Sequence, residues 1–331
     1  NSKIIHRVII FTNSSLGVPA ILMKNTLDAI THRSDLEICA ICLPKRQSPL
    51  KIFIFNFLYK ITIVIRILTE ETMRRKYKSL FPINIDRYAR KYGFKLLIPP
   101  NNNINDKYFI AYLRDEIRPT IALSFYCLNK FSPELMAIFN YAINYHNSFL
   151  PEYRGRNATA WSLYQGEKET GFTFHRMTDE LDGGNILVQK KLSVGSDDNA
   201  FDLEMEKAIH ASQCIPQILN MASQGCDGEP QIGEKSYYSW QDCLAITVIK
   251  DPSSLSKSEL MNRLKAFEKL EIKLSNQWYE VTGIKDVSHE SDKAGKFIFM
   301  TSDGYLMKAV HFLYLPLTLY QGFKMIKKYF E

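Results

Sequence analysis

The first part of the chain alternates short apolar runs with segments of helical spacing. The runs HRVIIF at 6–11 and LEICAICL at 36–43 are bounded by polar residues, as is typical of buried strands. Between them, VPAILMKNTLDAIT has the spacing of an amphipathic helix. This order of strand, helix and strand predicts βαβ units, and therefore an α/β domain with a mostly parallel, Rossmann-like sheet.

The same pattern continues along most of the chain. Further strands are predicted at 95–99, 120–126, 142–148, 170–177 and 185–194, and further helices at 84–94, 106–119, 132–139, 157–167 and 198–223. Asp198 is expected to cap the last helix. In a parallel sheet, ligands bind at the carboxyl ends of the strands, so those ends are the places to look for chemistry.

The pattern changes after residue 225. GCDGEPQIGEKSYYSW at 225–240 contains glycines and a proline and is typical of a linker. Beyond it, a helix is expected at 256–270 and several strands follow. We therefore predict a catalytic domain over 1–225 and a smaller α+β or barrel-like accessory domain over 226–331.

Residues 45–80 differ from their surroundings, because they are both strongly apolar and strongly basic. KIFIFNFLYKITIVIRIL at 51–68 alternates polar and apolar positions as a strand does, and RRKYKS at 74–79 is a basic cluster. One hypothesis is an insertion that covers the sheet edge. The other is a patch that binds an anionic membrane surface, together with the C-terminal LYQGFKMIKKYFE.

Charge and cysteine content narrow the class of protein only a little. The 331 residues carry a formal net charge of +7, which favours anionic partners such as nucleotides. Cys39 and Cys42 lie in an apolar run without a second pair, so no metal site or disulfide framework is expected. Neither a signal peptide nor a long apolar stretch is seen, which favours a cytoplasmic protein.

Three polar residues suggest a specific chemistry. Asn144 and His146 stand two apart in a predicted strand, so both point to the same side, and Asp182 lies in the turn LDGG. An amide can donate to a developing oxyanion, an imidazole can take a proton, and a carboxylate can orient the imidazole. The combination suits acyl transfer to an amine. The nucleophile elbow GxSxG is absent, so a covalent acyl-enzyme is not indicated.

The stretch NYHNSFLPEYRGRNATAWSLYQGEKETGFTFHRMTDELDGGNIL at 144–187 resembles the folate-dependent formyltransferases. The resemblance implies a catalytic triad of Asn144, His146 and Asp182 and the donor 10-formyltetrahydrofolate, without a metal. It further implies a set of donor-binding residues, Tyr126, Leu128, Met177, Asp179 and Leu181. A second implied set borders the acceptor: Thr12, Asn13, Ser14 and Arg156.

The acceptor stays open at this point. A nucleotide-linked amino sugar, or another small anionic amine, fits the basic charge and leads over methionyl-tRNA. The same residues also suit a formyltetrahydrofolate hydrolase, in which water is the acceptor, and a binding module without catalysis is the remaining alternative. The sequence leaves the oligomeric state open.

Overall fold

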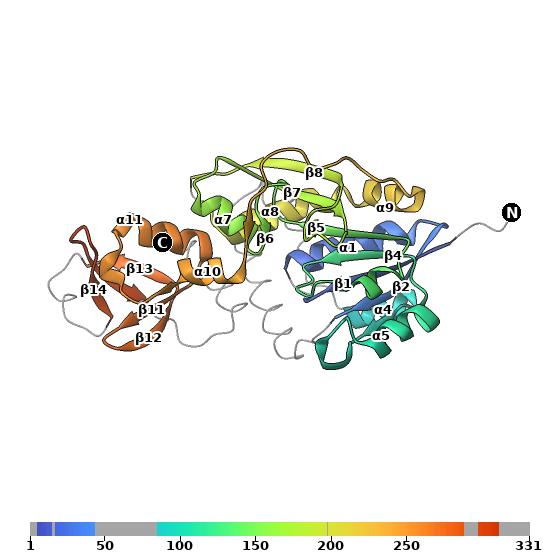
Figure 1. The fold of residues 1–331 in the computed structure, drawn as a ribbon, viewed down its shortest axis with the longest axis horizontal. Helices are drawn as coiled ribbons and strands as arrows, with labels where there is room; N and C mark the ends of the chain where they lie inside the picture. Colours follow the sequence, from blue (N-terminus) through green and yellow to red (C-terminus); the bar gives the residue numbers. More distant parts are fainter. Residues whose placement is uncertain (1–4, 15–16, 44–84, 197, 288–296, 311–331) are drawn as a thin grey trace, which may run out of the picture.

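The computed structural model describes residues 5–14, 17–43, 85–196, 198–287 and 297–310. Its centre is a seven-stranded sheet in the order β3-β2-β1-β4-β5-β7-β8 (Figure 1). The strands are β1 (His6–Thr12), β2 (Leu36–Cys42), β3 (Lys95–Leu97), β4 (Ile121–Phe125), β5 (Tyr141–His146), β7 (Glu169–Arg176) and β8 (Ile186–Ser193). The pairs from β3 to β5 are parallel, whereas β7 is antiparallel to both neighbours. The mostly parallel sheet is confirmed.

Helices cover both faces of this sheet. The helices of the large domain are α1 (Val18–Thr31), α4 (Ile85–Tyr92), α5 (Lys107–Tyr112), α6 (Pro133–Met136), α7 (Ala158–Tyr164), α8 (Ala200–Ser212) and α9 (Ile215–Gln224), with shorter turns at Pro100–Asn102 and Leu113–Ile117. Alternate residues of β1 belong to different cores. Val8 and Ile10 pack with α1, α8 and α9, while Ile9 and Phe11 pack with α5 and α6. Because successive side chains of a strand point to opposite faces, β1 contributes to the apolar core on both faces of the sheet.

The predicted helix 198–223 is wrong in two respects. It is split into α8 and α9, because Pro216 near the start of α9 has no N–H to continue the ladder. Its cap is Asn199, whose side chain accepts from the N–H of Asp202 at 3.0 Å. Asp198 instead accepts from the N–H of Gly195 at 2.7 Å, within the preceding turn.

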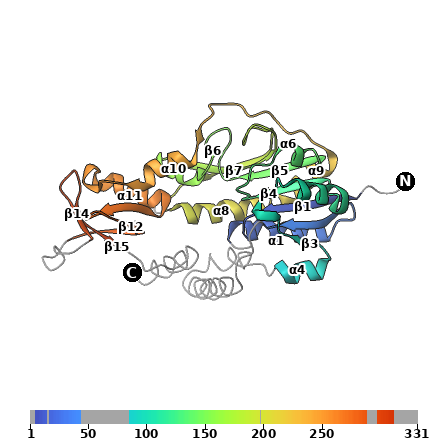
Figure 2. The same ribbon diagram turned by 60° about the horizontal axis from the view of Figure 1, so that its bottom comes forward.

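A smaller module follows, as expected for the fold class. Its elements are β9 (Tyr237–Tyr238), α10 (Trp240–Thr247), β10 (Val248–Ile249), a short turn at Pro252–Ser254, α11 (Lys257–Phe267), β11 (Leu270–Leu274), β12 (Gln277–Val281), β13 (Gly283–Asp286), β14 (Ile298–Met300) and β15 (Leu306–Val310). Two three-stranded sheets, β10-β11-β12 and β13-β15-β14, enclose its own core. Figure 2 shows this module at the opposite end of the molecule from β3.

The module is joined to the large domain by contacts of α11. Asn262 Nδ2 donates to the backbone oxygen of Tyr164 at 3.0 Å, and Tyr164 Oη donates to Glu259 at 2.7 Å. Glu268 accepts from the N–H of Phe201 at 3.1 Å, so the end of α11 satisfies a free donor at the start of α8.

The segment 225–240 is more than a linker. Its β9 pairs in parallel with β6 (Arg154–Gly155), directly after the loop that follows His146. Residues 45–80 and the last thirteen residues lie outside the described part of the chain, so neither hypothesis for them is tested. In the described part, no helix is long and apolar enough to cross a bilayer.

The core prediction concerns Phe174 on β7, which is fully buried and lies with its ring 5.4 Å from that of Tyr145. Phe174→Ala should lower the free energy of unfolding by about 3–5 kcal/mol, because it leaves a cavity that the sheet cannot close. Urea unfolding measures this, with Tyr108→Ala as the control on a ring that is 73% exposed. Equal losses in both variants would contradict this account of the core.

Candidate active site

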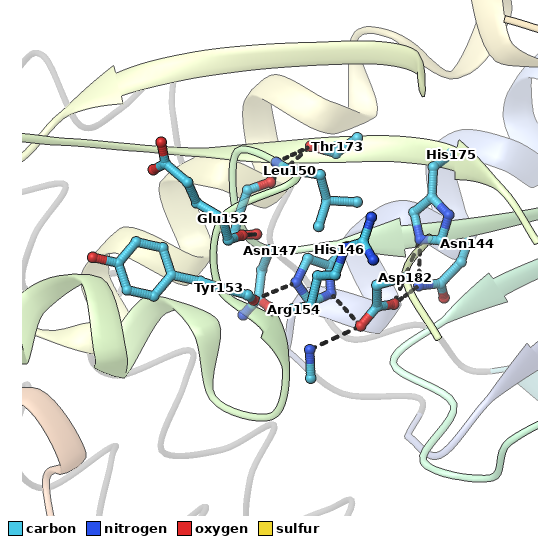
Figure 3. Close-up of polar contacts among 12 residues, drawn as sticks. Asn144, His146, Asn147, Leu150, Glu152, Tyr153, Arg154, Thr173, His175 and Asp182 are labelled. Carbon is cyan, nitrogen blue, oxygen red and sulfur yellow. Dashed lines mark hydrogen bonds and ion pairs between the residues drawn. The ribbon is translucent and has the colours of Figure 1, made fainter. Parts of the chain in front are cut away.

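The carboxyl end of β5 carries two of the three predicted catalytic residues. Asn144 and His146 lie on the same side of the strand and both approach Asp182, which comes from the turn after β7 (Figure 3). Asn144 Nδ2 is 3.4 Å from Asp182 Oδ1, and His146 Nδ1 is 3.6 Å from Asp182 Oδ2. The structure therefore brings all three residues together.

Asp182 is held by the backbone around it. It adopts a positive φ of 50°, and its Oδ2 accepts from the N–H of Gly155 at 2.9 Å. Gln231 Nε2 donates to the backbone oxygens of Asp182 (2.7 Å) and Gly184 (2.8 Å). A side chain at Gly184 would collide with the backbone oxygen of Arg176, so the turn requires glycine there. These contacts fix the carboxylate before any substrate arrives.

The hydrogen bonds of His146 indicate which ring nitrogen carries the proton. Its Nε2 lies 2.8 Å from the backbone oxygen of Tyr153, which can only accept, so Nε2 carries the proton. In the neutral ring, Nδ1 then has the free electron pair and faces Asp182. A proton taken up at Nδ1 would be stabilised by that carboxylate.

A further histidine belongs to the site and was missed in the sequence. His175 on β7 is directly opposite Asn144 in the antiparallel register, and paired residues point to the same face. Its Nδ1 is 2.7 Å from the backbone oxygen of Arg176, so Nε2 accepts from Asn144 Nδ2 at 3.2 Å. His175 Nε2 is also 3.6 Å from Asp182. His175 therefore orients the amide of Asn144. The only signal was its place in TGFTFHRM, which is visible once the register is known.

Burial sets the protonation of the triad. Burial lowers the pKa of His146, and the attraction of Asp182 only partly offsets this effect. Burial by itself would raise the pKa of Asp182, but the N–H of Gly155 and the positive charge that His146 and His175 carry when protonated hold it well below its usual range. At neutral pH the site therefore presents an ionised carboxylate beside a neutral imidazole, which is what a general base requires.

The residues assigned to the donor lie in the loops after β4 and β7. Tyr126 has a positive φ of 58°, and its hydroxyl is 3.2 Å from Asn147 Nδ2. Leu128 is 64% exposed and Leu181 43% exposed, so both present apolar surface to solvent. The N–H of Met177 donates to the backbone oxygen of Ala142, which ties its loop to β5. The carboxylate of the remaining residue, Asp179, is exposed.

The residues assigned to the acceptor fall into two groups. Thr12 is buried at the end of β1, and its hydroxyl donates to the backbone oxygen of Ser14 at 3.1 Å, with Asn13 half-buried between them. Arg156 is exposed, and its guanidinium lies 5.9 Å from the ring of Trp240. Thr12 ends β1 and Arg156 directly follows β6, and no described contact joins the side chain of either residue to the triad.

A metal site and a reactive pair at Cys39 and Cys42 find no support in the described residues. None of them forms a group of three His, Cys, Asp or Glu residues placed to hold a metal ion. Cys39 and Cys42 are buried on β2, and burial raises the pKa of the Cys39 thiol to about 12 and that of Cys42 further. Both are therefore core residues and not reactive thiols.

Comparison with known proteins finds one family that matches part of the chain. Residues 101–219 match the formyl transferase family. GDP-perosamine N-formyltransferases of Brucella melitensis and Brucella abortus are 42% identical over 98 residues, which is 30% of this chain. The match covers 38% of the length of these curated relatives. The expected family is confirmed for this part of the chain.

Solved structures extend the similarity of fold to nearly the whole chain. An N-formyltransferase from Helicobacter canadensis, solved with folinic acid and dTDP-3-aminofucose, has a TM-score of 0.56 at 17% identity. It covers 93% of this chain and 100% of its own. A sugar N-formyltransferase from a Shewanella species gives 0.56 at 13% identity and covers 94% and 99%. The smaller module is therefore part of a shared architecture.

The turn that holds Asp182 yields a test with a matched neighbour. Gly184→Ala should cost about 1–3 kcal/mol of stability, because the new Cβ meets backbone that cannot move aside. Gly183→Ala should cost less, since its Cβ meets only the flexible side chain of Glu180, which is exposed. Chemical denaturation measures the loss of unfolding free energy in each variant. A larger loss in Gly183→Ala than in Gly184→Ala would contradict this account of the turn.

The protonation of His146 has a consequence for stability. Its folded pKa is lowered, so the unfolded chain binds its proton more tightly and stability falls as pH drops below the unfolded value of about 6.5. His146→Gln should flatten the dependence of the unfolding free energy on pH between about 7.5 and 5.5. Urea unfolding at several pH values measures the slope. An unchanged slope would show that His146 is not buried as a neutral base.

Proposed function

We propose that this chain, of which residues 101–219 match the formyl transferase family, moves a formyl group from 10-formyltetrahydrofolate to the amine of a nucleotide-linked sugar. The observation that carries the proposal is the position of Asp182, whose two carboxylate oxygens reach both His146 and Asn144. An amide donor, a neutral imidazole and an ionised carboxylate around one point are what transfer of an acyl group to an amine requires.

The proposed chemistry assigns one task to each residue. The acceptor amine attacks the formyl carbon, the new C–N bond forms, and the bond from that carbon to the donor nitrogen breaks. His146 Nδ1 takes the proton that the amine loses and passes it to the departing nitrogen. Asp182 stabilises the imidazolium while it carries that proton. Tyr153 fixes the ring through its carbonyl oxygen.

Asn144 is the proposed donor to the formyl oxygen. Its two amide hydrogens face His175 at 3.2 Å and Asp182 at 3.4 Å. The contact to Asp182 is the longer one, so it is the contact that a substrate oxygen would replace. His175 would keep the amide in place during this exchange, because its own orientation is set by the carbonyl of Arg176.

The donor supplies the activated formyl carbon, and the two loops beside the triad fit a flat ring system. Leu128 and Leu181 offer exposed apolar side chains, and the 177–182 turn offers backbone groups at its edge. A folate-type compound is present in the Helicobacter canadensis structure, and this supports the same class of donor here.

The acceptor is proposed from the relatives and from one surface feature. The Brucella relatives are named for a GDP-linked amino sugar. Here the exposed Arg156, beside Trp240, follows Gly155 directly, and Gly155 contacts Asp182. A guanidinium at that position suits the phosphates of a nucleotide. We propose that residues 1–225 are the catalytic domain and 226–331 an accessory domain that helps to bind the acceptor.

The decisive experiment measures release of tetrahydrofolate from 10-formyltetrahydrofolate. It compares no acceptor, a panel of GDP-, UDP- and dTDP-linked amino sugars, and methionyl-tRNA. Release is expected only with an amino sugar, and His146→Ala should reduce it by at least about 10²-fold, because the base is lost. His210→Ala, on the surface of α8, is the matched control and should keep wild-type activity.

Each of the other outcomes would indicate a different function. Release without any acceptor would show a hydrolase, and release only with methionyl-tRNA would move the acceptor to RNA. Binding of the donor without turnover under any condition, unaffected by His146→Ala, would show a binding module.

A further inference from the structure

A network of buried polar groups lies directly behind the residue that follows His146. Lys207 on α8 has no exposed surface, and its Nζ donates to the backbone oxygen of Asn147 at 2.8 Å and to Thr159 Oγ1 at 3.0 Å. Glu204, one turn earlier on α8, accepts from Asn147 Nδ2 at 3.0 Å. Asn147 is thus held at its backbone by a lysine and at its side chain by a glutamate.

The remaining contacts close the network around Asn147. Its Nδ2 is also 3.1 Å from Thr159 Oγ1 and 3.2 Å from Tyr126 Oη. Tyr126 in turn stacks on Tyr145, the residue before His146, with ring centroids 5.9 Å apart. The residues on both sides of His146 therefore contact helices α7 and α8 and the residue that follows β4.

Burying a lysine and a glutamate in a core costs desolvation free energy. Burial lowers the pKa of Lys207 and raises the pKa of Glu204. Apolar side chains of similar volume would often be at least as stable. The polar pair contributes a defined geometry. Hydrogen bonds to the backbone oxygen and from the side-chain amide of Asn147 allow only one position for this loop.

The charges around the network come from several elements. Glu268 at the end of α11 adds to the rise in the pKa of Glu204, and Tyr126 and Tyr145 face it from the sheet. On the other side, the charge of Lys207 contributes to the lowered pKa of His146. His146 itself is otherwise surrounded by Asp182 and His175.

We propose that Lys207 and Glu204 are positioning residues for His146, acting through Asn147. They hold the backbone so that Nε2 of His146 stays on the Tyr153 carbonyl and Nδ1 faces Asp182. Neither residue touches the reacting atoms. The inference rests on the proposed function, in which His146 takes the proton of the acceptor amine.

The first test uses Lys207→Met in the full chain. Loss of the bond to the Asn147 carbonyl should lower kcat for formyl transfer by about ten- to hundredfold, because a small misplacement of a base is costly. KM for donor and acceptor should change by less than about twofold, since Lys207 is fully buried and neither substrate contacts it. Lys24→Met removes a lysine paired with Asp28 at the surface of the adjacent helix α1 and is the matched control.

A second pair of variants covers the case in which Lys207→Met does not fold. Glu204→Gln retains an oxygen that can accept from Asn147, whereas Glu204→Leu does not. The conservative variant should keep kcat within about fivefold and the apolar one should lose at least about tenfold. Equal activity in both would overturn the proposal.

A readout without turnover separates this proposal from the proposed function. NMR titration of labelled histidine in Lys207→Met should show His146 titrating at higher pH than in the wild type, because a positive charge is gone. If this shift appears but the wild type transfers no formyl group, the function fails and the positioning stands. If stability alone falls, with kcat per folded enzyme and the His146 titration unchanged, Lys207 is only structural and the proposal fails.

Discussion

The carboxylate of Asp182 is the contact on which the arrangement of the site depends. One of its oxygens is bound by the N–H of Gly155 and faces His146, and the other faces Asn144 and His175. A buried carboxylate is stable only when its charge is met on all sides. The surrounding backbone therefore has to be placed before the side chains can act, which explains the positive φ of Asp182 and the glycine at 184.

The smaller module contributes to this placement. Gln231 binds the backbone of the Asp182 turn, and Ser236 accepts from the N–H of Tyr153 at 2.7 Å through its hydroxyl. The same Tyr153 supplies the carbonyl that holds His146. Residues after 225 thus complete the loop and the turn that carry the triad, although they lie beyond the segment matched by the family.

Much of the sheet could be predicted from the sequence because its signals are local. Each of these signals involves a few neighbouring residues: the apolar runs of β1 and β2, and the spacing of Asn144 and His146. The structure confirms both strands and places these two side chains on the same side of β5. The split between α8 and α9 was also a local signal, since Pro216 stands in the middle of the predicted helix. The apolar spacing continues through Pro216, so the spacing alone predicts one uninterrupted helix.

The rest of the site depends on distances that the sequence does not contain. His175 reaches Asn144 only through the register between β5 and β7. Lys207 reaches Asn147 across sixty positions, and by itself a lysine in a helix indicates a solvent-facing side chain. Its contact with the backbone beside His146 appears only when α8 is packed on the sheet.

The residues proposed for the chemistry and those proposed for recognition of the acceptor differ in their burial. Of the groups proposed for the chemistry, His146 and Asp182 are buried and Asn144 is half-buried, and the contacts of all three are set by the fold. The groups proposed for recognition, such as Arg156 and Trp240, lie at the surface, where a substitution changes little else. An enzyme built in this way can keep one reaction while its acceptor changes, because selection of the acceptor does not disturb the contacts of Asp182. In this proposal the segment 144–187 determines the reaction, and the surface beside β9 determines the acceptor.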